Sequence, residues 1–272
     1  MAAMITSTHN PRVQWVRSLQ SQPQARREHQ AFVVEGVRLV EEALEAGWLA
    51  QLVFYTEDLP PRGQKIVDAY QEKGVKTELV APHVLKAAAD TGTPQGILAV
   101  LPIQRLPLPQ HAGLVLIADG VRDPGNLGTI LRTACAAGVD AVLLPPGSTD
   151  AFAPKVVRAG MGAHMRISIH TLEWRDIEDY LFKRELPLKV YLADASGGMY
   201  YTSADLRAPL ALIIGGEAEG AGSEARSLAV ESIHIPMPGK IESLNAAVAT
   251  AILLFEVVRQ RSYGPEQDRK SP

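Results

Sequence analysis

Five polar residues lie beyond the predicted ends of three buried strands, where they could act together on one ligand. In chain order they are Asn126 and Arg132 after the first strand, Glu217 in a glycine-rich turn after the second, and Ser243 and Asn245 after the third. Ligands of open parallel sheets bind beyond the carboxyl ends of the strands. Arg132 can reach back along its helix toward an anion at the helix N-terminus. The carboxylate of Glu217 suits a ligand with hydroxyls, an amine or a positive charge.

Each of these loops also has a purely structural interpretation. The first could be a capped helix with a surface arginine, the second a tight glycine turn, and the third a proline-bounded turn followed by a helix cap. Their occurrence at three strand ends favours a functional site. Neither a GxxxxGK[ST] nor a GxGxxG motif is present, so a phosphate loop or an ordinary dinucleotide site loses its main support.

The elements that must position these residues form two α/β patterns. The proline-rich segment 104–112 separates them, and we expect it to be a semi-rigid linker. The first pattern predicts a small domain over residues 1–103, in which Asn10 followed by Pro11 marks a helix start. Its other predicted elements are strands at 32–34, 52–55, 75–80 and 97–101 and helices at 37–46, 64–72 and 82–88.

The second pattern predicts a parallel sheet covered on both faces by helices, over residues 113–263, because strands and helices alternate along it. A closing helix begins near Asn245 and is apolar nearly all round, so we expect it to be buried on all sides, against the sheet and another body such as a second subunit. Ser243 or Asn245 would cap it. A disordered tail is expected at 264–272. The predicted strands are 114–118, 141–144, 166–169, 189–193, 210–214 and 232–235, and the other predicted helices are 127–137, 154–159, 174–185 and 224–228.

Three segments of the second domain, NLGTILRTACAAGV, LIIGGEAEG and IPMPGKIESLNAAVATAILL, carry a resemblance to a known family. In this order they closely resemble the signature motifs of the SpoU (TrmH) family of RNA ribose 2′-O-methyltransferases, in the SPOUT superfamily. Through FVVEGVRLVEEALEAG and PQGILAVL, the first domain resembles the family's L30e-like substrate-binding extension. The resemblance covers roughly residues 9–262. It implies an α/β protein whose C-terminal SPOUT domain has a parallel sheet and a deep trefoil knot.

The resemblance also implies methyl transfer from S-adenosylmethionine to a ribose 2′-hydroxyl, by a homodimer that associates through the C-terminal domain and needs no metal. It assigns the cofactor to Ile214, Gly215, Gly216, Glu217, Ile235, Met237 and Leu244, and catalysis to Arg132, Asn126, Glu217, Ser243 and Asn245. In the family, the residue matching Arg132 activates the hydroxyl, as a general base assisted by an RNA phosphate. Because arginine keeps its proton in proteins, binding that phosphate and stabilising the developing alkoxide is an equally economical role. Glu217, favoured over Glu219, could bind the ribose of the cofactor or of the RNA, or order its loop.

Two basic stretches without acidic residues, 1–27 and 151–172, stand out in a chain of net charge −3. They could form an anion-binding surface or be ordinary solvated faces. With the resemblance, the residues expected to contact RNA phosphates are Arg12, Arg17, Arg26, Arg27, Lys155, Arg158 and Arg166. Structured ribosomal RNA is favoured over tRNA, because family members that act on large rRNA often carry the L30e-like extension.

Three alternatives stay open beside this interpretation. They are a tRNA 2′-O-methyltransferase, a non-catalytic RNA-binding protein of the same fold, and an α/β enzyme acting on a small nucleotide. The presence of all five polar residues argues against a decayed site, and the missing phosphate loop argues against the nucleotide enzyme.

Composition is that of an ordinary globular protein, with 46% hydrophobic and 21% charged residues, and a length of 272 residues favours two domains. The single cysteine, Cys135, excludes an internal disulfide and a cysteine-based zinc site and fits a reducing cytoplasm. The N-terminus lacks the apolar core of a signal peptide. The longest apolar run, residues 246–255, is far shorter than the ~20 residues of a membrane span. We therefore expect a soluble cytoplasmic protein.

Overall fold

The computed structural model describes residues 4–216, 220–239 and 241–262. The chain forms two compact units. Unit 1 consists of Met1–Gln104 together with Asp150–Arg166, and unit 2 consists of Arg105–Thr149 and Ile167–Pro272. The division expected from the sequence leaves the segment 150–166 in the second domain, whereas its contacts place it in unit 1.

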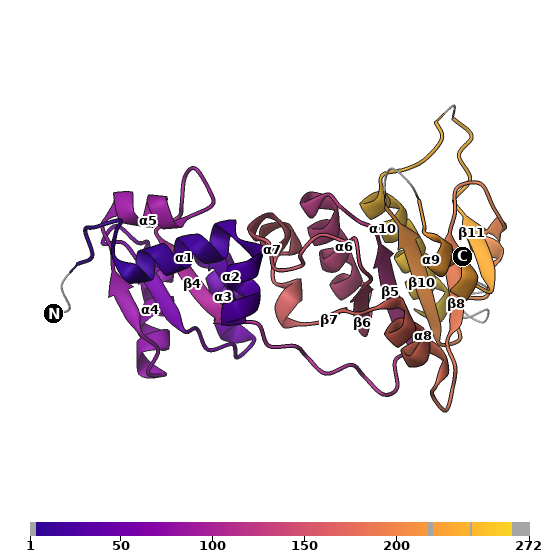
Figure 1. Ribbon diagram of the computed structural model, residues 1–272, viewed down its shortest axis with the longest axis horizontal. Coiled ribbons are helices and arrows are strands. Elements are labelled where there is room, and N and C mark those ends of the chain that lie inside the picture. The colour runs from indigo at the N-terminus through magenta and orange to yellow at the C-terminus, as the bar shows by residue number, and fades with distance from the viewer. Residues whose placement is uncertain (1–3, 217–219, 240, 263–272) are drawn as a thin grey trace, which may run out of the picture. The chain divides into compact units, whose positions relative to one another are not determined.

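Unit 1 is built on a sheet with the strand order β1-β4-β2-β3. Figure 1 shows this sheet among the helices of the unit. The strands are β1 (Ala31–Glu35), β2 (Leu52–Tyr55), β3 (Thr77–Leu79) and β4 (Ile97–Pro102). β4 pairs antiparallel with β1 and β2, whereas β2 and β3 are parallel. The helices of the unit are α1 (Pro11–Ser21), α2 (Pro23–His29), α3 (Val37–Glu45), α4 (Pro61–Glu72), α5 (Pro82–Ala88), α7 (Pro154–Gly160) and the 3-10 helix η1 (Ala163–Met165).

Apolar side chains pack on both faces of this sheet. Phe32 and Val33, neighbours on β1, belong to two different cores, as the alternation of side chains along a strand requires. The core around Phe32 also contains Val157 and Met165. These two residues come from the segment 150–166, which explains why that segment belongs to unit 1.

Unit 2 contains a sheet with the strand order β7-β6-β5-β10-β8-β11-β9. The strands are β5 (Leu114–Asp119), β6 (Ala141–Leu144), β7 (Ser168–Thr171), β8 (Lys189–Ala193), β9 (Met199–Tyr200), β10 (Leu210–Gly215) and β11 (Glu231–His234). All pairings between these strands are parallel, which confirms the predicted parallel sheet. β10 lies between β5 and β8, with Gly215 opposite Asp119 and Ile214 opposite Ala193. The carboxyl ends of these three strands therefore lie side by side.

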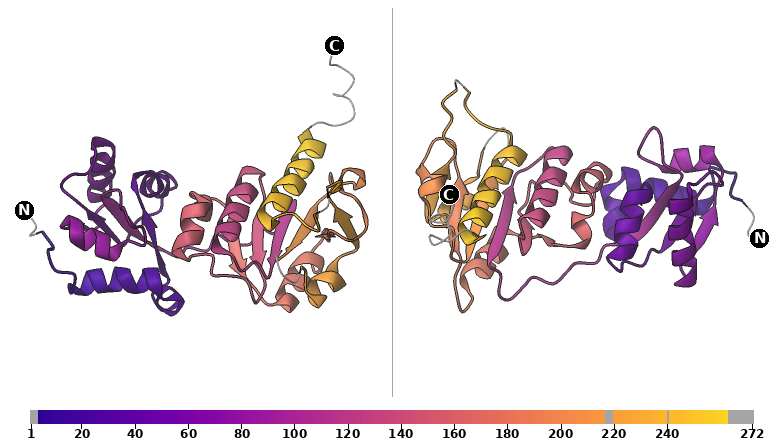
Figure 2. Two further views of the ribbon diagram at one scale, coloured as in Figure 1. Left: turned by 90° about the horizontal axis from the view of Figure 1, so that it is seen from above. Right: turned by 180° about the vertical axis from the view of Figure 1, so that it is seen from behind.

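Helices cover both faces of this sheet (Figure 2). On one face, α6 (Pro124–Ala136) packs against α10 (Ala246–Ser262), which also contacts β10. On the other, α8 (Trp174–Phe182) and α9 (Ser223–Leu228) contribute Ile177, Leu181 and Ala225 to an apolar core. A short 3-10 helix, η2 (Tyr201–Ser203), follows β9.

α10 is less buried than its composition predicts. Leu253, Leu254 and Val257 are buried against unit 2, whereas Val248 and Phe255 expose 49% and 48% of their surface. The single chain therefore accounts for only part of the expected burial and leaves an apolar strip of α10 open, so burial of that strip by a second subunit stays a prediction. Within the described part of the chain, no helix combines the length and apolarity needed to cross a bilayer.

Most predicted elements are present with small shifts at their ends. β2, α5, β6 and β8 have the predicted bounds, and Asn10 caps α1 as expected, while α2 and β9 are absent from the prediction. α6 starts at Pro124, three residues earlier than predicted, because the side chain of Asp123 accepts the Asn126 N–H and caps the helix there.

The proline-rich segment 104–112, expected to be a semi-rigid linker, is hydrogen-bonded to other parts of the chain. The hydroxyl of Ser168 donates to the Leu106 carbonyl at 3.0 Å, and the hydroxyl of Tyr180 donates to the Pro109 carbonyl at 2.9 Å. Both partners belong to unit 2, so this part of the chain is packed along that unit.

Candidate active site

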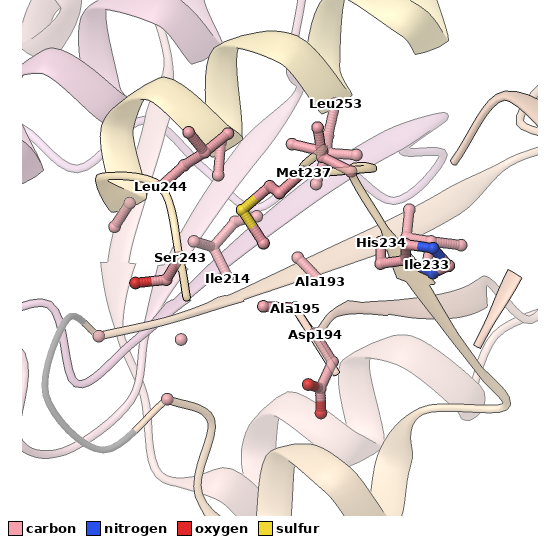
Figure 3. Close-up of a pocket in the computed structure, with 16 residues that line it drawn as sticks. Ala193, Asp194, Ala195, Ile214, Ile233, His234, Met237, Ser243, Leu244 and Leu253 are labelled. Atoms are coloured by element: carbon pink, nitrogen blue, oxygen red, sulfur yellow. The ribbon is translucent and has the colours of Figure 1, made fainter. Parts of the chain in front are cut away.

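A cavity of about 230 Å³ opens at the carboxyl ends of β8, β10 and β11, with the start of α10 on one side (Figure 3). Six residues expected to hold the cofactor line it, namely Ile214, Gly215, Gly216, Ile235, Met237 and Leu244. Glu217, the seventh, lies outside the described residues. The structure thus brings the rest of the predicted set together around one space, and their role toward a ligand stays a prediction.

The glycines at the end of β10 are required by the close approach of neighbouring loops. A Cβ on Gly215 would lie 2.4 Å from the backbone nitrogen of Ala221, and a Cβ on Gly216 would lie 2.2 Å from the carbonyl oxygen of Gly120. Both distances are well inside van der Waals contact, so another residue would push the loops apart. This edge of the cavity is therefore formed by backbone.

Much of the remaining lining of the cavity is apolar. Ile214, Met237 and Leu244 lie together on it, and Leu253 of α10 lies beside them (Figure 3). Ligand pockets commonly combine such apolar walls with a few backbone polar groups that fix orientation. The cavity thus suits a ligand that combines an apolar part with polar groups.

A carboxylate that the sequence analysis overlooked, Asp194, follows directly after β8 and also lines the cavity. Its Oδ1 accepts the hydroxyl and the backbone N–H of Ser196, at 2.7 and 3.0 Å, and its Oδ2 accepts Arg226 Nη1 at 2.6 Å. These hydrogen bonds, with those from Ser196 dominant, lower the pKa of Asp194 to about 2. The position after a predicted strand at 189–193 was a usable signal, since the same rule selected the other site residues.

Two of the predicted catalytic residues, Asn126 and Asn245, are in direct contact. Asn245 Nδ2 donates to Asn126 Oδ1 at 3.0 Å, which ties the first turn of α6 to the entrance of α10. Asn245 Oδ1 accepts the N–H groups of Ala247 and Val248, at 2.9 and 3.2 Å, and so caps α10 as predicted. Both ends of the Asn245 amide are thus engaged by the protein, an arrangement suited to positioning.

Ser243 and Arg132 offer their polar groups to solvent. Ser243 lines the cavity, whereas Arg132 lies on the exposed side of α6 and is not among the cavity-lining residues. Among the described residues, neither side chain has a hydrogen-bond or ion-pair partner. In the same part of the chain, no group of three His, Cys, Asp or Glu side chains is arranged to hold a metal ion.

Arg26 is misplaced in the predicted RNA-binding set. It is only 3% exposed, and its Nε donates to Asp150 Oδ2 at 2.8 Å while its Nη1 donates to the Leu19 carbonyl at 2.6 Å. The guanidinium therefore forms hydrogen bonds inside unit 1 and does not reach a ligand at the surface.

The other predicted basic residues are described by their exposure and by the ion pairs that they form. Arg17, Arg27 and Lys155 are exposed. Arg12, Arg158 and Arg166 form ion pairs within unit 1, with Glu78, Asp90 and Glu42 respectively. The basic character of the two sequence stretches is therefore partly cancelled in the folded unit.

Comparison with known proteins relates both parts of the chain to RNA methylation. Residues 113–255 match the SpoU rRNA Methylase family, and residues 10–99 match the MRM3-like substrate binding domain. Over 256 residues the chain is 32% identical to the 23S rRNA (guanosine(2553)-2′-O)-methyltransferase RlmP of Bacillus subtilis, covering 93% of this chain and 98% of that protein. Over 295 residues it is 34% identical to rRNA methyltransferase 3, mitochondrial, of Homo sapiens, covering 84% of this chain and 67% of that protein.

A solved structure extends the similarity to three dimensions. The crystal structure of AdoMet-bound rRNA methyltransferase from Sinorhizobium meliloti matches with a TM-score of 0.85 and 32% identity, covering 95% of this chain and 98% of that chain.

Proposed function

Because the chain belongs to the SpoU rRNA Methylase family and is an S-adenosylmethionine-dependent RNA 2′-O-methyltransferase, we propose that its substrate is a ribose in a structured segment of ribosomal RNA. The match of residues 10–99 to the MRM3-like substrate binding domain supports the RNA substrate, and the observation that carries the methyl transfer itself is the cavity at the ends of β8, β10 and β11. It lies within the residues matched to the family and gathers six of the residues that the family motifs assign to the cofactor. A single cysteine in the chain fits an enzyme of the cytoplasm.

The residues of the cavity fit S-adenosylmethionine. The apolar wall formed by Ile214, Met237 and Leu244 suits an adenine ring, and the glycine edge lets backbone groups approach the polar parts of the ligand. The oxygens of Asp194 are engaged by Ser196 and Arg226. We therefore assign the polar contacts with the ligand chiefly to backbone groups.

The bound cofactor supplies an electrophilic methyl group. In the transfer a C–O bond would form as the S–CH3 bond breaks, S-adenosylhomocysteine would be released, and the hydroxyl proton would pass to solvent water. The protein must then orient the ribose 2′-hydroxyl and stabilise the charge that develops on its oxygen. We place Arg132 at the phosphate beside the reacting ribose, where its guanidinium would stabilise this charge. A guanidinium that stays protonated at neutral pH is well suited to that role and poorly suited to that of a general base.

The remaining polar residues of the site would serve mainly to position the reactants. The exposed hydroxyl of Ser243 at the cavity is proposed to bond to the ribose. Asn245 would hold Asn126 in place through the hydrogen bond between their amides, because correct orientation alone can account for much of a rate enhancement. Glu217 keeps its proposed role in binding a ribose or ordering its loop.

We also propose that unit 2 contains the deep trefoil knot of SPOUT domains and that unit 1 has the L30e-like fold. The path of the chain supports the knot, since after β11, which lies toward one side of the sheet, the chain returns to place α10 against α6 and the central strand β10. The match of residues 10–99 to a substrate binding domain supports an RNA-binding role for unit 1. Its exposed Arg17 and Arg27 are then the leading contacts for RNA phosphates, and the exposed Lys155 is a further candidate.

A homodimer through unit 2 would cover the open strip of α10. Val248 and Phe255 are each about half exposed on a helix with few polar residues, an arrangement typical of a surface that a partner covers. A second subunit would also complete the burial that the sequence of this helix predicts.

One assay tests the function directly. The protein is incubated with methyl-labelled S-adenosylmethionine and either unmodified ribosomal RNA or unmodified tRNA, and labelled riboses are mapped. We expect label in ribosomal RNA. Label only in tRNA would support the alternative substrate, and cofactor binding without transfer to any RNA would indicate a non-catalytic RNA-binding protein.

A variant assigns the role of Arg132. Arg132→Ala should lower the rate of transfer by about 100-fold or more, the effect of removing one stabilising donor, while the Kd of the cofactor changes by less than about twofold. Arg175→Ala, which removes another exposed arginine of unit 2, on α8, is the matched control. Loss of cofactor binding in the Arg132 variant would contradict the proposed role.

A further inference from the structure

Two carboxylates, Asp119 and Asp194, flank the strand end that forms the glycine edge of the cavity. Asp119 is the last residue of β5 and pairs with Gly215. On the other side of β10, Ala193 pairs with Ile214, so Asp194 follows at the level of Gly215. The two carboxylates therefore approach the end of β10 from opposite neighbouring strands.

Asp119 holds the segment that follows β10. It is only 7% exposed, and its Oδ2 accepts the backbone N–H of Gly222 at 2.7 Å. Gly222 precedes the first residue of α9. A hydrogen bond to an ionised carboxylate is stronger than one between neutral groups, and a buried carboxylate needs such partners. This bond therefore ties the start of α9 to the end of β5.

Asp194 holds the same segment through Arg226 of α9. Arg226 Nη1 donates to Asp194 Oδ2 at 2.6 Å, and Arg226 Nε donates to the carbonyl of Ala221 at 3.2 Å. Ala221 lies so close to Gly215 that its backbone nitrogen would be 2.4 Å from a Cβ at that position. Residues 220–222 are thus held against Gly215 from both sides.

We propose that Asp119 and Asp194 are paired positioning residues for cofactor binding, which keep residues 220–222 against Gly215 and so preserve the glycine edge of the cavity. The inference rests on the proposed function, in that the cavity receives S-adenosylmethionine. Gly215, Gly216 and Gly220 all line this space. A small shift of residues 220–222 therefore changes the shape that the cofactor meets, and the two carboxylates act on it through the protein groups that they bind.

Calorimetric titration of the full chain with S-adenosylmethionine tests the proposal. Asp119→Ala should raise the Kd about tenfold, the scale of one lost hydrogen bond to a charged group. Asp119→Asn keeps an oxygen that can accept the Gly222 N–H, so its Kd should stay within about threefold of the wild-type value. Asp205→Ala is the matched control, since it removes a surface carboxylate that pairs with Arg207 outside the cavity.

Steady-state kinetics separate positioning from general stability. For Asp119→Ala we expect a higher KM for the cofactor with kcat, at saturating cofactor, within about twofold of wild type. A lower Tm with unchanged Kd and KM would mean that the carboxylate only stabilises the fold and would overturn the proposal. If Asp119→Ala does not fold, Arg226→Lys carries the same test, because it keeps a positive charge near Asp194 and loses the bond from Nε to Ala221. A wild-type protein that binds no cofactor would instead refute the proposed function itself.

Discussion

Replacing Asn245 by aspartate separates the capping of α10 from the orientation of Asn126. In the wild-type protein Asn245 Oδ1 accepts two N–H groups of the first turn of α10, and Nδ2 donates to Asn126 Oδ1 at 3.0 Å. An aspartate keeps the acceptor oxygen and caps helices as well as asparagine does. Its second oxygen cannot donate, so it would face the Asn126 oxygen without a hydrogen bond. Asn126 must then rotate its amide so that Nδ2 faces the aspartate. Its Oδ1 is then presented to the substrate in place of Nδ2.

The expected magnitudes follow from these contacts. Asn245→Asp should leave the Tm nearly unchanged, because the cap is kept. It should lower kcat about tenfold, or about 1.4 kcal/mol in the activation free energy, the scale of one misdirected hydrogen bond. Asn245→Ala removes the cap as well, so it should also lose about 1 kcal/mol of unfolding free energy, or about 2–4 °C in Tm.

Steady-state methyl transfer at saturating cofactor and RNA, together with thermal unfolding, measures both effects. The double variant Asn126→Ala with Asn245→Asp should be no slower than Asn126→Ala alone, since the second change acts only through the first residue. Wild-type kcat in Asn245→Asp would refute the reasoning about the amide. An equal fall in Tm for the aspartate and alanine variants would refute the reasoning about the cap.

Three further predictions concern the fold and its assembly. Arg26→Met should lower the unfolding free energy by about 2 kcal/mol in urea titrations, because it leaves the partly buried Asp150 without its partner; no change would mean that the ion pair is dispensable. Phe255→Asp should convert a dimer into a monomer in light scattering, since it places a charge on the open strip of α10; a wild-type monomer would exclude this interface. Burial lowers the pKa of His164 from 6.5 to about 4, so the unfolded chain binds the proton first as the pH falls. Relative to His164→Phe, the wild-type protein should therefore lose about 3 kcal/mol of stability between pH 6.5 and 4 and none above pH 7; parallel pH profiles would contradict this.

The strands and helices that could be predicted are those whose own residues determine them. β2, β6 and β8 are short apolar runs, and their predicted bounds agree with the structure. α2, with the sequence PQARREH, has no apolar periodicity to predict it. The helix is held in part by the hydrogen bond from Arg26 to Asp150, a residue 124 positions away in the sequence. A contact of that kind leaves no local pattern in the sequence.

The same limit applies to the interpretation of charge. A run of arginines without acids looks like an anion-binding surface, yet Arg26 is buried and Arg158 and Arg166 are paired with Asp90 and Glu42. Each acidic partner comes from a distant part of the chain. Burial and pairing are properties of the tertiary structure, so sequence reasoning could select the basic stretches and could not sort their members.

The polar groups around the cavity fall into two classes that should respond differently to substitution. Asn245, Asp119 and Asp194 already have protein partners at the oxygens or nitrogens that they offer. We therefore predict that they influence the reaction mainly through geometry, so a substitute that keeps the same hydrogen bond should restore function. Arg132 and Ser243 have no such partner among the described residues. Their contribution would be made to the RNA and to the developing charge, which an isostere without the donor cannot replace. Conservative substitutions therefore distinguish the residues that build the site from those that act on the substrate.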